Sequence, residues 1–276
     1  MKRTLTIWSA GICILIAGCS QGNSIPSVSE TAAATPSPAP AAVPTATPTP
    51  IPTATPAPTP IEVKKEYHMN KNYDIVPNDP AGNKKVVLLT FDDGPKEKEM
   101  NEALVKTLDK HKAKAIFFMN GYRIKQKPEL VTFIHNSGNY IGNHSWDHIH
   151  LNEQTNEKID QQIDDVQRIV KGIIGQTPQY FRPPNGLGND YLKNKIKNEG
   201  MLYMTWSNGS LDWEMTTKKN DPNKVIDNVM KQLHFGSNIL MHELPWTVEA
   251  LDPLLTKLEE KGYSFVDPGS IELEMR

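Results

Sequence analysis

The stretch Val86-Val-Leu-Leu-Thr-Phe-Asp-Asp-Gly-Pro95 decides both the fold and the position of the chemistry. Its first six residues form a mostly apolar run, which is typical of a strand that is buried on both faces. The adjacent carboxylates of Asp92 and Asp93 follow at once, and Gly94-Pro95 then supplies turn residues. Because Asp-Asp-Gly-Pro alone is ordinarily a surface turn, the acid pair indicates a site only if suitable partners occur elsewhere in the chain.

Suitable partners occur about fifty residues later, in His144-Ser-Trp-Asp-His148. A four-residue gap places two imidazoles on one side of a turn or helix, as in several zinc sites. The chain has eight histidines, so such a pair can arise by chance. One aspartate and two histidines can nevertheless hold a divalent ion and leave positions open for water. The second aspartate is then placed to take a proton from that water.

Strand-like and helix-like segments alternate along the rest of the chain. About seven repeats of this rhythm predict an α/β fold, a parallel (β/α) barrel rather than an open sheet. The predicted strands are 86–91, 113–119, 140–142, 179–181, 201–206, 238–241 and 264–266. The predicted helices are 97–112, 128–136, 159–173, 189–198, 223–233 and 248–261.

Polar residues follow several of the predicted strands. Besides the two pairs above, Arg182, Asp212 and His242 each come just after one. The loops at the carboxyl ends of barrel strands converge on one rim, so these side chains are expected to meet there. Taken singly, Arg182 could be a surface residue and His242 a structural one. The two prolines that follow Arg182 stiffen its loop, which suits a guanidinium aimed at a carboxylate.

In this order, five segments resemble the five motifs of the polysaccharide deacetylases, the NodB-homology domain of carbohydrate esterase family 4. The resemblance extends over about residues 84–268. The segments are Thr90-Phe-Asp-Asp-Gly-Pro95, His144-Ser-Trp-Asp-His148, Arg182-Pro-Pro-Asn-Gly186, Asp212-Trp213 and Leu240-Met-His242.

The resemblance implies a distorted (β/α) barrel of about seven strands and a metal-dependent site. The metal would be a divalent transition metal, zinc first, with cobalt, nickel and manganese as alternatives. The implied roles are as follows: metal ligands Asp93, His144 and His148; general base Asp92, held by Arg182; general acid His242, tuned by Asp212; pocket and groove walls Leu240 and Trp213; and oxyanion binding by the backbone N–H of Asn185.

Two positions depart from the family pattern. The family often has tyrosine where this chain has Asn185, which should alter the groove more than the catalysis because the backbone N–H is the functional group. The family also often has an acid three residues before the Asp-Trp pair, where this chain has Gly209. A glycine there removes a carboxylate from the support of Arg182 and from the acid side of the site.

The N-terminus predicts export and lipidation. Lys2 and Arg3 precede an apolar run of about a dozen residues, too short for a comfortable membrane span. The run ends in Ala17-Gly18-Cys19, which resembles the lipobox of bacterial lipoproteins. We therefore expect a signal peptide at 1–18 and a lipidated Cys19.

A spacer and the catalytic domain follow. Residues 19–61 are rich in Ala, Thr and Pro, and eleven of the 22 prolines lie between Pro26 and Pro60. Such a segment cannot pack a core and favours extended polyproline II backbone. The expected organisation is thus a disordered spacer at 19–61, a catalytic domain at 62–276, and a location outside the cytoplasm, lipid-anchored to the bacterial cell membrane and extending into the cell wall.

Composition narrows the function further. The cysteines are Cys13 and Cys19, so the processed chain could form no internal disulfide. The net charge is −2 and there is no basic block, which argues against nucleic-acid binding. We expect a monomer whose partners are the membrane and a polysaccharide containing N-acetylglucosamine.

The predicted reaction is removal of acetyl groups from N-acetylglucosamine residues of an extracellular polysaccharide, with peptidoglycan first. Chitin-like oligomers, another exopolysaccharide and acetylxylan are alternatives within the family. A wall-polysaccharide-binding lipoprotein with little turnover is an alternative of another class, which Gly209 and Asn185 leave open. A secreted metallophosphatase is less favoured, because the chain lacks a dedicated phosphate cradle.

Overall fold

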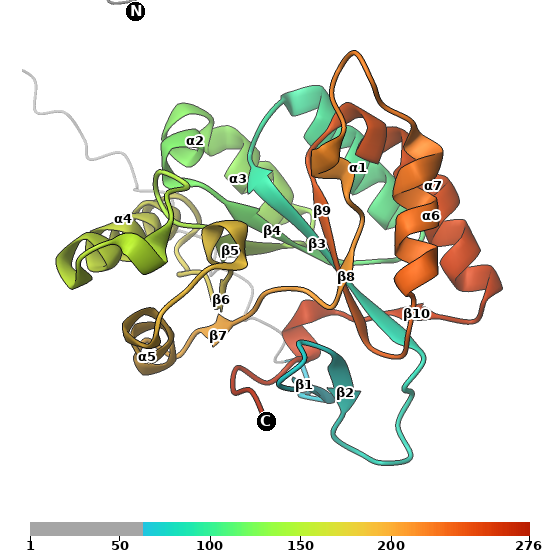
Figure 1. Ribbon diagram of the computed structural model, residues 1–276, viewed down its shortest axis with the longest axis horizontal. Coiled ribbons are helices and arrows are strands. Elements are labelled where there is room, and N and C mark those ends of the chain that lie inside the picture. The colour runs from blue at the N-terminus through green and yellow to red at the C-terminus, as the bar shows by residue number, and fades with distance from the viewer. Residues whose placement is uncertain (1–62) are drawn as a thin grey trace, which may run out of the picture. The chain divides into compact units, whose positions relative to one another are not determined.

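The computed structural model describes residues 63–276. The predicted signal peptide (1–18), Cys19 and the spacer (19–61) lie outside the described residues, so they stay predictions. The described part is an α/β unit in which one curled sheet is covered by helices (Figure 1).

The main sheet is parallel throughout. Seven of its strands run in the order β7-β6-β5-β4-β3-β9-β8, and β10 pairs with the beginning of β3. Within residues 63–276 the edge strands β7 and β8 do not pair with each other, so the barrel is distorted and open at that point. The predicted fold class is therefore confirmed. The strands are β3 (Val86–Gly94), β4 (Ala115–Met119), β5 (Tyr140–Asn143), β6 (Tyr180–Phe181), β7 (Leu202–Tyr203), β8 (Asn208–Gly209), β9 (Ser237–His242) and β10 (Ser264–Phe265).

The central strand β3 is buried on both faces, as its apolar run predicts. Alternate residues Val87, Leu89 and Phe91 pack into the large core between the sheet and the helices. Val86 and Leu88 point the other way, into a second core inside the curl of the sheet. Because side chains alternate along a strand, the inner face continues from Leu88 to Thr90 and Asp92. This alternation directs Asp92 toward the inside of the curl.

In the part of the chain that the structure describes, seven α-helices follow or precede these strands. Helices α1, α6 and α7 lie together beside β3 and β9, where α7 packs on both of the others (Figure 1). Helix α3 packs on α4, and α4 on α5. The helices are α1 (Lys98–Lys110), α2 (Gly121–Gln126), α3 (Pro128–Asn136), α4 (Asn156–Ile174), α5 (Asp190–Asn198), α6 (Pro222–Gln232) and α7 (Pro245–Glu260). None of the helices within residues 63–276 is both long and apolar enough to cross a bilayer.

A small hairpin closes the inner core at the amino ends of the strands. It consists of β1 (Tyr67–Met69) and β2 (Ile75–Pro77), which pair antiparallel. Its Met69 and Ile75 join Ile271 from the C-terminal segment in the core inside the curl. The opposite end of the sheet, where the strands finish, remains available for polar loops.

The sequence-based boundaries are mostly accurate to a few residues, but several short elements differ. Helix α2 and strands β1, β2 and β8 were not predicted, because segments of two to six residues are too short to show a periodic pattern. The strand predicted at 201–206 pairs only at Leu202–Tyr203. The following residues leave the ladder, and the Thr205 carbonyl accepts hydrogen bonds from a buried side chain instead.

Two glycines near the end of α4 give a matched stability test. Gly175 ends the helix in the left-handed region, at φ 76°, whereas Gly172 lies inside the helix with open space where a Cβ would be. We expect Gly175→Ala to destabilise the protein by roughly 1–2 kcal/mol, because a Cβ strains that backbone. Gly172→Ala should stabilise it by roughly 0.5–1 kcal/mol. Urea unfolding of both variants measures the two effects, and equal signs would contradict the assignment.

Candidate active site

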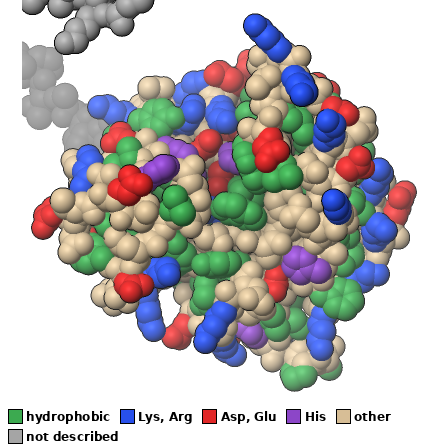
Figure 2. Space-filling model, viewed as in Figure 1, with side chains coloured by type: hydrophobic (Ala, Val, Ile, Leu, Met, Phe, Trp, Pro, Cys, Tyr) green, Lys and Arg blue, Asp and Glu red, His purple; other side chains and the backbone are tan. Residues whose placement is uncertain are grey.

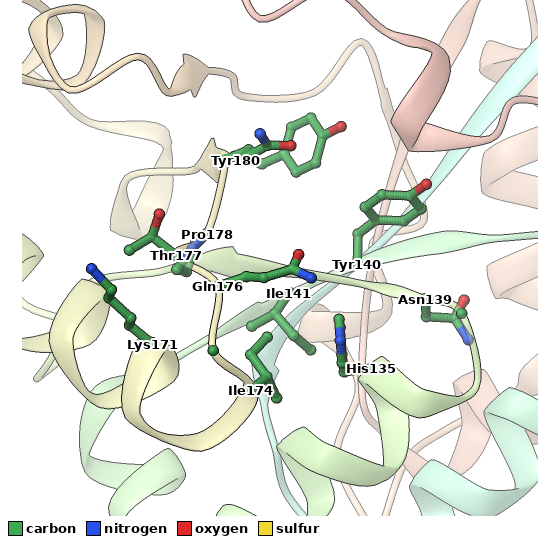
Figure 3. A pocket seen from close by; sticks show the side chains of 13 residues that line it. His135, Asn139, Tyr140, Ile141, Lys171, Ile174, Gln176, Thr177, Pro178 and Tyr180 are labelled. Carbon is green, nitrogen blue, oxygen red and sulfur yellow. The ribbon is translucent and has the colours of Figure 1, made fainter. Parts of the chain in front are cut away.

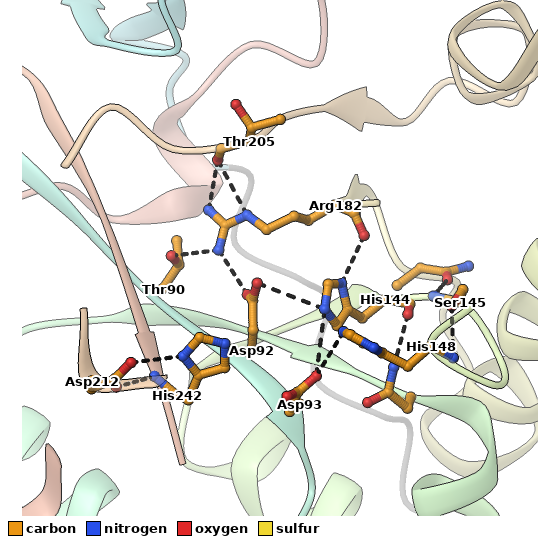
Figure 4. A network of polar contacts seen from close by, with 12 residues as sticks. Thr90, Asp92, Asp93, His144, Ser145, His148, Arg182, Thr205, Asp212 and His242 are labelled. Atoms are coloured by element: carbon orange, nitrogen blue, oxygen red, sulfur yellow. Dashed lines mark hydrogen bonds and ion pairs between the residues drawn. The ribbon is translucent and has the colours of Figure 1, made fainter. Parts of the chain in front are cut away.

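The polar side chains predicted from separate parts of the sequence meet at the carboxyl end of the sheet (Figure 4). Asp92 and Asp93 end β3, His144 follows β5, Arg182 follows β6 and His242 ends β9. In Figure 2, histidine and acidic side chains lie close together near the middle of the face that is drawn. The convergence expected from strand order is therefore present in the structure.

An irregularity in β3 allows two consecutive aspartates to face one site. In a regular strand, neighbouring side chains point to opposite faces. Here the pairing of β3 with β4 shifts register between Phe91 and Gly94, and Asp93 has a φ of 65°. Bulges of this kind redirect side chains next to active sites. Asp92 and Asp93 are consequently both within 4 Å of the His144 ring nitrogen Nε2.

Asp93, His144 and His148 form a cluster with the character of a metal site. Asp93 Oδ1 lies 3.2 Å from His148 Nε2 and 3.6 Å from His144 Nε2. One possible ligand atom from each residue lies within 4.8 Å of the other two. Asp93 Oδ1 is buried and accepts no hydrogen bond from the described residues. A buried carboxylate oxygen without a donor is costly unless something else binds it, and a cation meets that need.

The second nitrogen of His144 supports the same interpretation. His144 Nδ1 lies 2.8 Å from the Arg182 carbonyl oxygen, so this nitrogen carries the proton and donates it. The Nε2 lone pair is then free to face the cluster, an orientation common among metal-bound histidines. Burial lowers the pKa of His144 despite the nearby aspartates, which keeps the ring in the neutral form that a metal requires.

The charges around Asp93 favour its ionised form. Burial opposes ionisation, but the nearby basic groups, His144, His148, His242 and Lys96, outweigh it and lower the pKa of its carboxyl group. An ionised oxygen and two neutral imidazoles are a ligand set that suits zinc and related transition metals. The residues therefore fit the predicted divalent metal.

The loop that carries the histidines is held from three sides. Asn143 Oδ1 accepts the backbone N–H of Ser145, and Gln162 of α4 exchanges two hydrogen bonds with Asp147. Asn120, at the end of β4, donates its side-chain amide to the His144 carbonyl and its backbone N–H to the Gly94 carbonyl. Asn120 thus joins the aspartate loop to the histidine loop, a role that a lone asparagine does not reveal in the sequence.

Arg182 is the largest fully buried side chain, and it binds Asp92. Its Nη1 donates to Asp92 Oδ1 at 2.7 Å and to Thr90 Oγ1 at 2.8 Å. Its Nε and Nη2 donate to the Thr205 carbonyl at 3.1 and 2.8 Å, and the guanidinium stacks on the Phe118 ring. Asp92 itself is only 3% exposed. The pair fixes one carboxylate oxygen and leaves the other facing His144.

Asp212 holds His242 on the other side of the site. Asp212 Oδ1 lies 2.8 Å from His242 Nδ1, and Oδ2 accepts both the His242 backbone N–H and the Thr247 hydroxyl at 2.7 Å. Burial alone would lower the pKa of His242, but the hydrogen bond and charge of Asp212 outweigh it and raise that pKa. The arrangement therefore favours an imidazolium that can donate a proton from its other nitrogen.

Aromatic and apolar groups border the polar cluster. Trp213 is 39% exposed, and its ring stands edge-on to His242 at 5.5 Å and to Trp206 at 6.2 Å. Leu240 is buried in β9, two residues before His242 and therefore on the same face. Asn185 is exposed at φ 58°, a left-handed conformation that asparagine tolerates better than most residues. This backbone explains why asparagine is acceptable there.

Gly209 turns out to leave Arg182 well supported. Besides Asp92, Arg182 donates hydrogen bonds to three neutral groups. These are the Thr90 hydroxyl, the Thr205 carbonyl and, at 3.3 Å, Asn238 Oδ1. A Cβ on Gly209 would lie 3.1 Å from the Trp213 ring, so the tryptophan fills the space that a side chain would need. Asp212 retains its contacts with His242. The loss of support expected from Gly209 is therefore not seen in the geometry.

Two cavities formed by the described residues lie away from this cluster. One cavity of about 500 Å³ lies near the amino ends of β5 and β6, with His135, Asn139, Lys171 and Tyr180 among its lining residues (Figure 3). Another, of about 920 Å³, lies between α5, β7 and the C-terminal segment. Neither is lined by any of the predicted site residues.

Comparisons with known proteins agree with the motif resemblance. A family model described as polysaccharide deacetylase matches residues 79–204. The chain is 37% identical over 191 residues to the peptidoglycan-N-acetylmuramic acid deacetylase PdaC of Bacillus subtilis, covering 69% of this chain and 39% of PdaC. It is 34% identical over 196 residues to the peptidoglycan-N-acetylmuramic acid deacetylase PdaA of the same organism, covering 70% of this chain and 74% of PdaA. The chain thus matches less than half of PdaC.

A solved structure has the same fold. The Bc1960 peptidoglycan N-acetylglucosamine deacetylase matches with a TM-score of 0.63 and 31% identity. This match covers 67% of the present chain and 86% of the Bc1960 chain.

The hydrogen bond between Asp212 and His242 predicts that the pKa of His242 depends on the charge of Asp212, which can be measured without substrate. Replacing Asp212 by Asn keeps one acceptor but removes the negative charge, so the pKa of His242 should fall. NMR titration of the His242 ring in EDTA-treated protein measures it. Asp190→Asn, an exposed change in α5, serves as the control and should leave the titration in place. An unchanged His242 titration in Asp212→Asn would contradict the assigned cause.

Proposed function

The chain belongs to the polysaccharide deacetylase family, and on this premise we propose that it is a metal-dependent N-deacetylase of peptidoglycan amino sugars. The single observation that carries the proposal is the cluster of Asp93, His144 and His148, beside a buried Asp92–Arg182 pair. Such a set combines the ligands of a divalent ion with a carboxylate that can act as a base.

Amide hydrolysis needs an activated water, stabilisation of the carbonyl oxygen and a proton for the leaving amine. A divalent ion held by Asp93, His144 and His148 would lower the pKa of the attacking water and polarise the acetamide carbonyl. Asp92 accepts the proton of the attacking water through the oxygen that Arg182 does not bind. The backbone N–H of Asn185 is the further donor proposed for the developing oxyanion.

His242 is the proposed general acid. Its Nδ1 is engaged by Asp212, so Nε2 is the nitrogen that can deliver a proton to the departing amine. The raised pKa of His242 favours the protonated form at neutral pH. The remaining walls, Trp213 and Leu240, orient the sugar ring by apolar contact. Release of acetate and of a free amine completes the reaction.

Two sugars of the wall are candidate substrates. The motif resemblance favours N-acetylglucosamine, and the Bc1960 structure is of an N-acetylglucosamine deacetylase. The PdaA and PdaC relatives are named as N-acetylmuramic acid deacetylases, which supports muramic acid as a second candidate. The alternative of a binding protein with little turnover is less favoured, because the proposed base, acid and ligand residues are all in place.

The proposed location follows from residues outside the described part. Cleavage before Cys19 and acylation of that cysteine would anchor the chain to the membrane, and the proline-rich stretch at 19–61 would carry the catalytic domain into the wall. Zinc remains the first choice of metal, with cobalt, nickel and manganese as alternatives. We propose that the protein acts as a monomer.

The roles of the two aspartates are separable. Asp93→Ala should weaken zinc binding by about 100-fold or more and abolish activity, because a ligand is lost. Asp92→Asn keeps the oxygen that accepts from Arg182, so zinc binding should persist while activity falls by about 100-fold or more. Isothermal titration with zinc and acetate assays on both variants provide the measurements. Equal loss of zinc in both variants would overturn the assignment.

The activity itself is tested by acetate release from N-acetylglucosamine oligomers and from peptidoglycan. The enzyme should be inactive after EDTA treatment and regain activity when zinc or cobalt is restored. Analysis of the reduced sugars in the product identifies whether glucosamine or muramic acid carries the free amine. A folded, zinc-loaded enzyme that releases no acetate from either polymer would refute the proposal.

A further inference from the structure

Two cationic side chains beside the metal cluster form no ion pair within residues 63–276. Lys96 lies three residues after Asp93, and Arg123 lies in α2. Within residues 63–276, neither the Lys96 ammonium nor the Arg123 guanidinium makes an ion pair or a hydrogen bond with another side chain. Arg123 Nε is also buried from solvent and has no hydrogen-bond acceptor.

The backbone brings both residues to the wall of the site. The Gly121 and Tyr122 N–H groups, directly before Arg123, donate to the Ser145 and Trp146 carbonyls of the histidine loop. The aspartate loop that carries Lys96 is joined to the same place, because Asn120 donates to the Gly94 carbonyl. Lys96 and Arg123 therefore flank the metal cluster from adjacent loops.

The position of Lys96 is fixed by its backbone. Its N–H donates to Glu243 Oε2 at 2.8 Å, and its carbonyl accepts from Lys127 Nζ. Glu243 is fully buried, and Asn101 donates to the same oxygen at 2.7 Å. These bonds hold the main chain of residue 96 without engaging its ammonium group. Glu243 forms no ion pair with the Lys96 ammonium, and its Oε1 accepts no hydrogen bond from the described residues. Burial raises the pKa of the Glu243 carboxyl group, although the nearby charges of Lys96 and Arg123 oppose this rise.

Arg123 is held in a similar way. Its guanidinium carbon lies 5.0 Å from the centre of the Tyr122 ring, so an aromatic face restricts it. Burial lowers the pKa of Lys96 although the charges of Asp93 and Glu243 oppose this effect, and the positive charge of Arg123 adds to the lowering, so the two cations lie within electrostatic reach of each other. Buried or half-buried charges in proteins are ordinarily paired. Two restrained cations that no carboxylate contacts directly leave hydrogen-bond donors, Arg123 Nε among them, free for an anionic ligand.

We propose that Lys96 and Arg123 form a subsite for the carboxylates that muramic acid and its stem peptides add to peptidoglycan. This subsite rests on the proposed function, and these carboxylates are what distinguishes peptidoglycan from neutral chitin-like oligomers. A guanidinium recognises carboxylates by directed hydrogen bonds, and an ammonium adds a compact charge. The subsite therefore directs the enzyme to the charged repeat of the wall. The carboxylate comes from the lactyl ether of muramic acid or from the peptide attached to it.

The test uses one oligomer in two charge states. Peptide-free peptidoglycan oligomers carry a free lactyl carboxylate, and carbodiimide coupling to methylamine removes that charge without changing the sugars. The readout is the ratio of kcat/KM for the charged over the neutral form. Wild-type enzyme should prefer the charged form, and Lys96→Gln combined with Arg123→Gln should lower the ratio by about tenfold. Lys96→Arg keeps the charge and should retain the preference.

Controls separate this result from a loss of structure. Lys106→Gln, an exposed change on α1, should leave the ratio as in the wild type, and thermal unfolding of each variant checks the fold. The preference should also weaken as salt rises. Oligomers that keep their stem peptides form a second arm: a preference only for these assigns the carboxylate to the peptide. Equal ratios in wild type and double variant, in both arms, would overturn the subsite.

Failure of the proposed function is distinguishable. Equilibrium binding of the charged and neutral oligomers gives the same ratio without turnover. If no acetate is released but the charge preference in binding depends on Lys96 and Arg123, the subsite stands and the deacetylase does not. If acetate is released without any charge preference, the deacetylase stands and the subsite is wrong.

Discussion

The buried guanidinium of Arg182 is the interaction on which the rest of the site depends. A fully buried charge is tolerated only where its hydrogen-bond donors are satisfied. Here the acceptors come from Thr90 and Asp92 of β3, from the Thr205 carbonyl after β7 and from Asn238 of β9. The backbone carbonyl of Arg182 accepts a hydrogen bond from His144 Nδ1 and so orients that ring. One arginine therefore fixes both the proposed base and a proposed metal ligand.

A second buried charge organises the opposite half. Asp212 is completely buried and accepts from His242 and Thr247, while its carbonyl accepts from Trp246. Arg182 and Asp212 carry opposite charges, and each binds a side chain of the opposite charge type at the edge of the site. Arg182 binds Asp92, and Asp212 binds His242. A substrate acetamide would then meet a base on the side of Arg182 and an acid on the side of Asp212. This division is the physical basis of the proposed hydrolysis.

Much of the fold and most of the site follow from the sequence. The run from Val86 to Phe91 fixes the central strand, and polar residues after successive strands must converge because parallel strands end at one edge. What the sequence does not reveal are groups that act through the backbone or through a single short contact. The Thr205 carbonyl, the bridging amide of Asn120 and the carboxylate of Glu243 have no local signature. The register shift that turns Asp93 beside Asp92 is likewise a property of the assembled sheet.

The most direct measurement of the central claim is anomalous diffraction at the zinc edge from crystals grown with zinc. We expect one strong peak at about 2.0–2.2 Å from Asp93 Oδ1 and from the Nε2 atoms of His144 and His148, with Asp92 still bound to Arg182. A peak coordinated by Asp92 in place of Asp93, or the absence of zinc from this cluster, would contradict it.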